Sequence, residues 1–381
     1  MAEAYIVDAV RTPVGTRKGG LAQAHSADLA AHVLSELVRR ADVDPTAVED
    51  VILGCVSQVG PQALDVARTA WLSAGLPEST PGVTIDRQCG SSQQAVHFAA
   101  QGVMSGTQDL VVAGGVENMA MVPMGANVSF ALEQGLALFG EEWTQQYGTQ
   151  EISQFRGAQL MCEKWGFTRE DLEKFALESH QRAVAAIEAG HFATEITPVN
   201  GVGQDEGARA DTTLERMAQL DPIREGWAIT AAVASQMSVG AGALLLASER
   251  AVAEHGLQPL ARVVQLDVLG DDPVYMLTAP IPATHRALGK AGLTIGDIDV
   301  FEVNEAFAPV PLAWAKETGA DLARTNPNGG AIALGHPLGA TGSVLMTKLV
   351  HELRRSGGRY GLQTMCEGGG QANVTIVEAL R

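Results

Sequence analysis

Two cysteines in glycine-rich turns, with a histidine loop between them, are the residues of this chain best suited to covalent chemistry. Cys89 opens the run CGSS, and Cys366 opens the run CEGGGQ. His336 stands between them, in NGGAIALGHP at 328–337. A cysteine can attack a carbonyl once a base has taken its proton, and a second cysteine can move a different proton. This set suits the making or breaking of a carbon–carbon bond beside a thioester.

The surroundings of Cys89 favour a nucleophile. It follows a predicted strand at 83–86 and directly precedes a predicted helix over 91–105. The partial positive charge of a helix N-terminus stabilises a thiolate, so we expect the pKa of Cys89 to be lowered. The alternative is a buried structural cysteine, which is the commonest role of a single cysteine.

The other candidates each have a structural alternative as well. Glycine before His336 and proline after it hold the imidazole on a stiff loop, although most histidines are not catalytic. Three glycines at 368–370 follow Cys366 closely, and their backbone N–H groups can bind an oxyanion; the alternative is a simple loop after a strand. Asn304 follows a predicted strand, where it orients a water or a carbonyl, or instead caps a helix.

The elements that must position these residues alternate between strand and helix. Strands are predicted at 4–10, 50–56, 83–86, 109–114, 298–303 and 360–365, and helices at 26–41, 65–74, 91–105 and 342–353. Such alternation favours a mostly parallel sheet with helices on its faces. The order strand, reactive turn, helix, strand occurs twice, which indicates an internal duplication. The more polar middle, with a long helix at 168–189, has the character of an insertion that carries a binding surface.

Composition limits the possible functions. The chain has 381 residues, 46% of them hydrophobic, and a formal net charge of −18. This charge argues against binding of bare nucleic acid, and a phosphorylated ligand would need a few well-placed Arg and Lys. Four cysteines are typical of reduced thiols, and we find neither a leader peptide nor an apolar run of membrane-spanning length. We therefore expect a cytoplasmic protein that does not associate with membranes.

Four motifs, taken in order, are similar to those of one family. They are CGSS at Cys89, NEAF at Asn304, the NGGAIALGHP loop of His336, and CEGGGQ at Cys366. The chain resembles the thiolase family in these motifs, and the resemblance runs from VDAVRTP at 7–13 to the C-terminus. It implies a five-layered α/β/α/β/α fold of two duplicated halves, usually assembled as a homodimer or homotetramer.

The resemblance also implies domain boundaries. The N-terminal half would comprise 1–118 plus 238–258, the inserted loop domain 119–237, and the C-terminal half 259–381. The loop domain would bind coenzyme A and the acyl group.

The activity implied is thiolytic cleavage of 3-ketoacyl-CoA to acetyl-CoA and a shortened acyl-CoA, or the reverse Claisen condensation, by a ping-pong mechanism. Cys89 would carry the acyl group. His336 would activate Cys89 and help to bind the thioester oxygen, and Asn304 would hold a water in the same oxyanion site. Cys366 would move the proton on the carbon beside the acetyl-CoA thioester. The N–H groups of Cys89 and Gly368 would form a second oxyanion hole.

Two further positions match residues that bind coenzyme A in the family. Ser235 corresponds to a serine that touches the pantetheine, and Arg209 to an arginine near the adenine. CoA and acyl-CoA would be substrates, with no permanently bound cofactor and no metal.

The chain also departs from the family pattern. Glycine is more usual at Ser92 and Ala372, Asn and Asp at Val233 and Val239, and an aliphatic residue at Glu367. The stretch ISQF at 152–155 lacks the His-Met pair of short-chain thiolases. We therefore expect bulkier 3-ketoacyl-CoAs, including sterol side chains, as in the actinobacterial degradative branch.

Two other functions compete with this reading. A decarboxylating condensing enzyme of the ketoacyl-synthase type shares the fold but places His or Asn where Cys366 stands. A non-catalytic lipid-binding or partner subunit would have lost the nucleophile, whereas this chain has Cys89, His336, Asn304 and Cys366.

Overall fold

The computed structural model describes residues 2–380, in which ten strands form one mixed sheet. The order is β4-β3-β5-β6-β1-β7-β10-β9-β8, and β2 pairs with β6. The strands are β1 (Ala4–Arg11), β2 (Gly15–Thr16), β3 (Asp50–Gly54), β4 (Gly82–Ile85), β5 (Leu110–Asn118), β6 (Ser238–Ser248), β7 (Ala261–Gly270), β8 (Val300–Val303), β9 (Tyr360–Glu367) and β10 (Gln371–Ala379).

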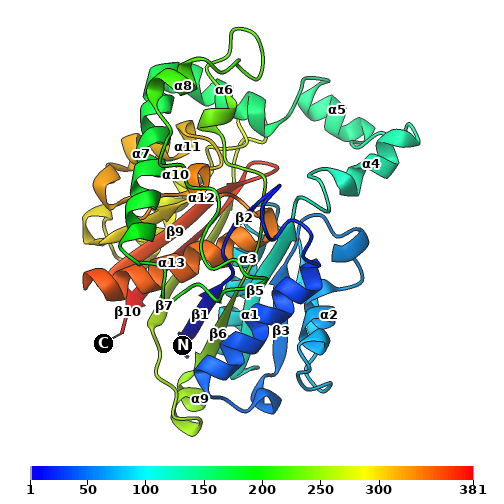
Figure 1. Ribbon diagram of the computed structural model, residues 1–381, viewed down its shortest axis with the longest axis vertical. Helices are drawn as coiled ribbons and strands as arrows, with labels where there is room; N and C mark the ends of the chain where they lie inside the picture. Colours follow the sequence, from blue (N-terminus) through cyan, green and yellow to red (C-terminus); the bar gives the residue numbers. More distant parts are fainter. Residues whose placement is uncertain (1, 381) are drawn as a thin grey trace.

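Thirteen helices cover or extend this sheet in the described part of the chain (Figure 1). They are α1 (Ser26–Ala41), α2 (Val66–Ser73), α3 (Ser91–Ser105), α4 (Ala126–Glu133), α5 (Glu141–Tyr147), α6 (Gln154–Trp165), α7 (Arg169–Glu188), α8 (Leu214–Ala218), α9 (Glu249–Glu254), α10 (Pro280–Ala291), α11 (Pro309–Thr318), α12 (Ala331–Leu334) and α13 (Thr341–Ser356). None of them is long and apolar enough to cross a membrane.

The predicted strands and helices are present, but the expectation of a mostly parallel sheet is wrong. Only β3–β4, β3–β5 and β8–β9 pair in parallel, and the other pairs of strands are antiparallel. The difference comes from β6, β7 and β10, which the sequence analysis did not identify. β6 is buried along its whole length, so it lacks the alternation that marks a half-exposed strand.

The strand order shows the internal duplication directly. In one half, β1, β6, β5 and β3 are neighbours, and in the other β7, β10, β9 and β8 are neighbours. Each series has two antiparallel pairs followed by one parallel pair. α3 precedes β5 in the first series, and α13 precedes β9 in the second. The halves of the sheet join where Tyr5 and Ile6 of β1 pair with Arg262 and Ala261 of β7.

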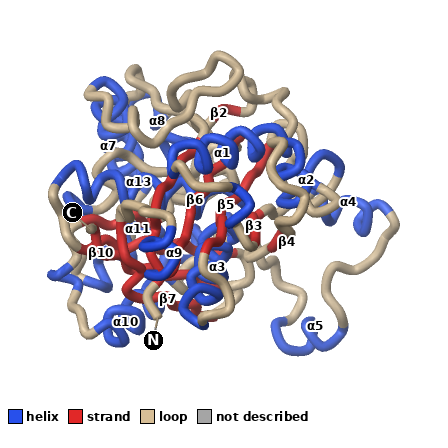
Figure 2. The backbone as a smooth tube through the Cα atoms, turned by 90° about the horizontal axis from the view of Figure 1, so that it is seen from below, coloured by secondary structure: helices blue, strands red, loops and turns tan. Residues whose placement is uncertain are grey.

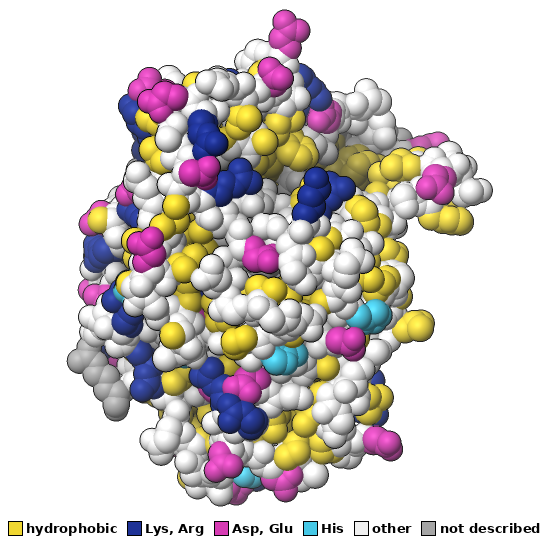
Figure 3. All heavy atoms as spheres, in the orientation of Figure 1, with side chains coloured by type: hydrophobic (Ala, Val, Ile, Leu, Met, Phe, Trp, Pro, Cys, Tyr) yellow, Lys and Arg dark blue, Asp and Glu magenta, His cyan; other side chains and the backbone are white. Residues whose placement is uncertain are grey.

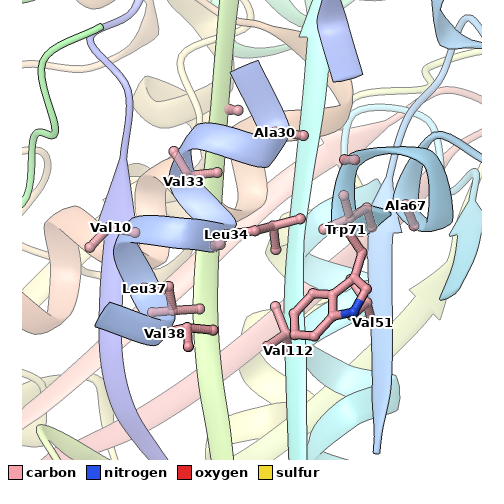
Figure 4. Packing of buried hydrophobic residues seen from close by; sticks show 14 of the residues in the cluster. Val10, Ala30, Val33, Leu34, Leu37, Val38, Val51, Ala67, Trp71 and Val112 are labelled. Atoms are coloured by element: carbon pink, nitrogen blue, oxygen red, sulfur yellow. The ribbon is translucent and has the colours of Figure 1, made fainter. Parts of the chain in front are cut away.

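The layers follow from the faces that each helix buries. α1 and α2 pack on the outer face of the first half (Figure 4). The apolar stripe of α1 places Leu34 and Leu37 over the strands. Trp71 of α2 lies beside Val51 and Val112. α10 and α11 cover the outer face of the second half. α3 and α13 lie between the two halves and share one core cluster with strands of both. The result is the predicted five-layered α/β/α/β/α arrangement.

The two inner helices approach each other closely. Ala95, Ala99 and Ala100 of α3 have no exposed surface, and a Cβ at Gly342 of α13 would lie 2.2 Å from the backbone nitrogen of Gln93. Small residues are therefore required at this contact. The close packing matters for function because it brings together the loops that precede α3 and α13.

A long segment separates β5 from β6. β5 ends at Asn118 and β6 begins at Ser238, and the segment between them contains α4–α8. α6, α7 and α8 pack above the second half, whereas α4 and α5 project away from the body as an arm (Figures 1 and 2). Neither α4 nor α5 has a buried residue. These strand ends coincide with the predicted domain boundaries at 118/119 and 237/238, and the boundaries themselves remain predictions.

Candidate active site

Residues from both halves of the fold meet at one place. Cys89 lies in the turn before α3, and His336 lies in the equivalent turn before α13. Asn304 directly follows β8, and Cys366 is the penultimate residue of β9. The side-chain nitrogen Nδ2 of Asn304 is 3.4 Å from Nε2 of His336. Cys89 and Cys366 lie close enough that a charge on Cys89 raises the pKa of Cys366. Cys89 also packs against the cluster that includes Leu338, two residues after His336. The structure thus places the four residues that the motifs indicated in one region.

The hydrogen bonds of His336 fix which ring nitrogen carries the proton. Nδ1 lies 2.6 Å from Oγ1 of Thr341, and the Thr341 hydroxyl donates to the carbonyl of Pro337 at 3.0 Å. Because the hydroxyl hydrogen is used in that bond, Oγ1 accepts from Nδ1–H. Nε2 is therefore the nitrogen without a proton, and it can act as a base.

The backbone around His336 is equally constrained. Its N–H donates to the carbonyl of Gln236 at 3.1 Å and lies 3.2 Å from Oγ of Ser238. Gly335 has φ of +111°, and a Cβ there would lie 2.2 Å from that same Ser238 oxygen. Burial lowers the pKa of His336 to about 4. The imidazole is therefore neutral at pH 7 and ready to accept a proton.

Cys89 rests as a thiol, contrary to the expected lowering of its pKa. Burial, followed by the negative charge of Glu367, raises the pKa of Cys89 to about 12. The backbone N–H groups of Cys89 and Gly368 oppose this rise. The helix terminus is thus outweighed by removal of the sulfur from water. A thiolate can form here when a base takes the proton.

The second cysteine is buried more deeply. Cys366 is 1% exposed, and burial together with the nearby Cys89 raises its pKa well above the ordinary value. It lies within β9 and packs in a cluster that includes Phe307 and Ile332. Cys366 is therefore neutral at rest as well, and can donate a proton.

Asn304 is held by its backbone and has one free side-chain atom. Its N–H donates to the carbonyl of Thr364 at 3.0 Å, which continues the β8–β9 ladder beyond Val303. The side chain is fully buried, and Oδ1 has no hydrogen-bond partner among the described residues. A buried carbonyl oxygen without a partner is suited to accept a bond from a ligand or a water.

A cavity of about 660 Å³ opens beside His336. Ser235, Arg209, Phe155 and Phe307 line it, and the rings of the two phenylalanines meet edge to face at 5.5 Å. The wall thus includes Phe155 from the stretch that lacks the His-Met pair.

Arg209 also lines a second cavity of about 380 Å³, together with Arg216 and His180. Lys and Arg side chains gather near the recess between the upper part of the molecule and the projecting arm (Figure 3). Ser235 and Arg209, both predicted to bind coenzyme A, therefore face the same space as His336.

Three residues that organise this site were not predicted from the sequence. Thr341 sets the tautomer of His336. Glu117 accepts N–H bonds from Ser57 and Gly339, and so ties the loop after β3 to the loop after His336. Glu305 accepts from Ser179 and from the N–H of Ile332 within the His336 loop. A buried carboxylate at the end of an apolar strand was the available signal for Glu117.

The departures from the family pattern have structural explanations in most cases. Ser92 accepts the N–H of Ser343 at 2.9 Å, which links α3 to α13. Val233 and Val239 are buried in apolar clusters, and Ala372 is buried opposite Cys366 in β10. Glu367 is buried beside Cys89 and has a different significance, described below. No cluster of three His, Cys, Asp or Glu in residues 2–380 could hold a metal ion.

Comparisons with known proteins agree with this geometry. The family model described as thiolase, N-terminal domain, matches residues 4–250, and the thiolase C-terminal domain matches residues 257–379. The chain is 57% identical to the steroid 3-ketoacyl-CoA thiolase FadA6 of Mycobacterium tuberculosis, over all of this chain and 95% of that protein. It is 43% identical to the 3-oxoadipyl-CoA/3-oxo-5,6-dehydrosuberyl-CoA thiolase of Escherichia coli, over 99% of this chain and 100% of that protein.

A solved structure shows the same fold. The crystal structure of the Bacillus anthracis acetyl-CoA acetyltransferase matches with a TM-score of 0.90 and 38% identity, over 100% of this chain and 99% of the other. These matches favour the thiolase reading over a ketoacyl-synthase-type enzyme or a non-catalytic subunit. Motifs, duplicated topology and comparisons agree, and the chain belongs to the thiolase family of acyltransferases.

Proposed function

We propose that this thiolase cleaves 3-ketoacyl-CoA with a bulky acyl chain, by a ping-pong mechanism through an acyl-Cys89 intermediate. The observation that carries the proposal is the pairing of a neutral base with a neutral thiol. Nε2 of His336 lacks a proton, and Cys89 retains its own. Transfer of that proton creates a nucleophile only when a substrate is in place.

In the first half-reaction, His336 takes the proton of Cys89, and the sulfur attacks the ketone carbon of the substrate. The C–C bond breaks, and the electron pair moves to the acetyl-CoA enolate. Cys366 then protonates that carbon and becomes a thiolate, since its raised pKa means that it still holds a proton at neutral pH. In the second half-reaction, the Cys366 thiolate takes the proton of the coenzyme A thiol, whose sulfur attacks the acyl-Cys89 thioester. The Cys89 sulfur leaves and recovers the proton held by His336, and the shortened acyl-CoA is released.

Two oxyanion sites would support these steps. Nε2 of His336, once it carries the proton taken from Cys89, and a water held by Asn304 would stabilise one oxygen, because the free Oδ1 of Asn304 can fix that water. The N–H groups of Cys89 and Gly368 would stabilise the other, and both already point at the Cys89 sulfur closely enough to affect its pKa. Preorganised donors of this kind make large contributions to catalysis.

The loop domain at 119–237 would bind coenzyme A and the acyl chain. Ser235 would contact the pantetheine, and Arg209 would lie near the adenine, since both line the space next to His336. The apolar wall, with Phe155 and Phe307, supports a bulky acyl group. A 57% identical relative that is named a steroid thiolase supports the same substrate class.

The assembly and the compartment are also proposals. A homodimer or homotetramer in the cytoplasm is the state that the family resemblance favours. All four cysteines are free thiols in the structure, which is compatible with a reducing compartment.

A thiolysis assay over 3-ketoacyl-CoAs of increasing size tests the proposal. We expect kcat/KM to be graded and higher for longer or ring-bearing substrates than for acetoacetyl-CoA, because each methylene contributes ~1–3 kcal/mol in an apolar pocket. Rapid quench and mass spectrometry should locate the acyl adduct on Cys89. An adduct on Cys366, or a preference for acetoacetyl-CoA over every longer substrate, contradicts the proposal.

A further inference from the structure

Glu367 is a buried carboxyl group directly behind the proposed nucleophile. It is the last residue of β9 and has no exposed surface. Side chains alternate along a strand, so Glu367 points to the opposite face from Cys366. There its Oε1 lies so close to Gly90 that a Cβ on this glycine would be 1.9 Å from it. Glu367 thus touches the residue that follows Cys89.

The carboxyl group has unusually few partners for a buried acid. Oε1 accepts the N–H of Asn373 at 3.0 Å, and Oε2 has no hydrogen-bond partner among the described residues. The nearest positive charge, Arg87, attracts Glu367 but donates its own hydrogen bond to the side chain of Gln371. A buried carboxylate that lacks donors is costly in its charged form.

The groups around Glu367 define what its charge can affect. The loop before α3 contributes Arg87 and Cys89, and β9 contributes Cys366. The neighbouring residues of β10, Gln371 and Asn373, are neutral. Asn373 contacts Gln94 and His97 of α3, which are also neutral. His97 is neutral because burial lowers its pKa to about 3. From β5, Glu117 acts on Cys89 as a weaker second negative charge. The charge of Glu367 is therefore the largest one that acts on the Cys89 sulfur.

We propose that Glu367 is a positioning residue for Cys89, which supports the Cys89–Gly90 turn and controls through its own charge how readily Cys89 transfers its proton to His336. This inference rests on the proposed function. When Glu367 is protonated, the thiolate faces a neutral acid. When Glu367 is ionised, two negative charges lie close together in a site removed from water, and thiolate formation is disfavoured.

The proton balance gives the expected pH dependence. Proton transfer from Cys89 to His336 changes no net charge, and His336 remains neutral above about pH 4. Burial raises the pKa of Glu367 to about 8. Acylation should therefore be nearly constant from pH 6 to 7.5 and fall as Glu367 ionises above that range. The falling limb belongs to Glu367, since the Cys89 thiol itself keeps its proton up to about pH 12.

Two variants separate charge from shape. Glu367→Gln keeps the size and the acceptor for the Asn373 N–H but removes the charge. Glu367→Leu removes both the charge and the acceptor. A matched control is Glu302→Gln on β8, a buried glutamate whose Oε1 also lacks a partner and which is bonded to Lys348 at 3.0 Å. Thermal unfolding at pH 7 establishes that each variant is folded.

The measurement is single-turnover acylation of Cys89 by a 3-ketoacyl-CoA between pH 6 and 9.5, followed by rapid quench and mass spectrometry. We expect the wild type and Glu302→Gln to lose roughly three- to tenfold in rate between pH 7 and 9, and Glu367→Gln to stay level. Glu367→Leu should also stay level, but at a lower rate at every pH, because it lacks the bond to Asn373 that supports the turn. A rate equal to that of Glu367→Gln would contradict the supporting role.

Alkylation of Cys89 by iodoacetamide provides a second readout that needs no substrate. At pH 9, Glu367→Gln should react several-fold faster than the wild type, because the thiolate no longer faces a negative charge. A falling limb that is unchanged in Glu367→Gln, or equal alkylation rates at pH 9, overturns the inference while leaving Cys89 as the nucleophile. If no acyl adduct forms on wild-type Cys89, the proposed function itself fails.

Discussion

Glu117 and Glu367 stand near the ends of equivalent strands in the two halves of the molecule, but their carboxylates are held very differently. Glu117, on β5, accepts the N–H groups of Val56, Ser57 and Gly339 and the side-chain amide of Gln62. Glu367, on β9, accepts one N–H and keeps one oxygen free. A repeated fold thus places similar groups in similar positions, and the surrounding donors decide whether a carboxylate clamps loops or acts on a neighbouring sulfur.

The same division applies to the reactive residues. The turn before α3 carries Cys89, and the equivalent turn before α13 carries His336. The first half supplies the proposed nucleophile, and the second supplies its proposed base, Asn304 and Cys366. With these roles neither half could perform acyl transfer alone, so we expect activity to depend on the packing of α3 against α13.

The largest effect should come from removing the thiol of Cys89, which the first half supplies. We expect Cys89→Ser to lose at least ~10³-fold in kcat for thiolysis, about 4 kcal/mol of barrier, because a hydroxyl is a far weaker nucleophile at neutral pH. Cys162→Ala serves as the control, since Cys162 is a buried cysteine of α6 and does not belong to the cluster against which Cys89 packs. More than a tenth of wild-type turnover in Cys89→Ser would show that the nucleophile lies elsewhere.

Removing the Glu117 carboxylate, which joins two loops, should mainly lower the stability of the fold. We expect Glu117→Ala to lower the free energy of unfolding by about 3 kcal/mol, because several buried N–H groups lose their acceptor. Urea unfolding at pH 7 measures this. The matched variant Glu367→Ala removes one such bond and should cost less. If the two variants are equally destabilised, the contrast between the carboxylates is wrong.

A smaller effect should come from the partner of His336. Thr341→Val keeps the shape of the side chain but removes the acceptor for Nδ1–H. The ring then no longer has a fixed tautomer, and we expect kcat to fall roughly tenfold, about 1.4 kcal/mol, with little change in KM. Thr341→Ser restores the hydroxyl and should recover most of the rate. Failure of Ser to rescue would point to packing rather than to the hydrogen bond.

A last effect is on stability as a function of pH. The native state holds the Glu367 proton up to about pH 8, whereas the ordinary pKa of a glutamate is 4.5. Between these values the unfolded chain binds fewer protons than the native state at this site, so the free energy of unfolding declines as pH rises. Glu367→Gln should decline less from pH 5 to 8 in urea titrations. Parallel wild-type and variant curves would place the titration of Glu367 outside this range.

Local motifs indicate the candidate reactive residues, but they do not give their electrostatics. Cys89, Asn304, His336 and Cys366 lie in short runs whose composition could be read directly, and the structure gathers them as expected. The pKa of Cys89 goes the opposite way from the prediction because burial of the sulfur raises it, and the charge of Glu367, from the other half of the chain, raises it further. A helix N-terminus is a local signal, whereas burial depends on the whole fold.

The fold was predicted with the same limitation. The amphipathic stripe of α1 and the small residues of α3 mark these helices clearly. β6 could not be recognised by alternation, because all of its residues are buried by helices or neighbouring strands. The antiparallel strand pairs were therefore not predicted, although the order of turns and helices did indicate the duplication.

The hydrogen bonds behind His336 have a consequence for the traffic of protons through the site. Nδ1 points to Thr341, whose hydroxyl points to the carbonyl of Pro337, and a peptide carbonyl has no proton to pass on and no tendency to take one. The chain of bonds is a dead end. A proton that binds at Nε2 must also leave from Nε2. The ring can therefore hold only one extra proton, which it must release before the next turnover. In the proposed mechanism, the proton taken from Cys89 is therefore returned within the site, and the ring provides no path through Nδ1 for protons from bulk water.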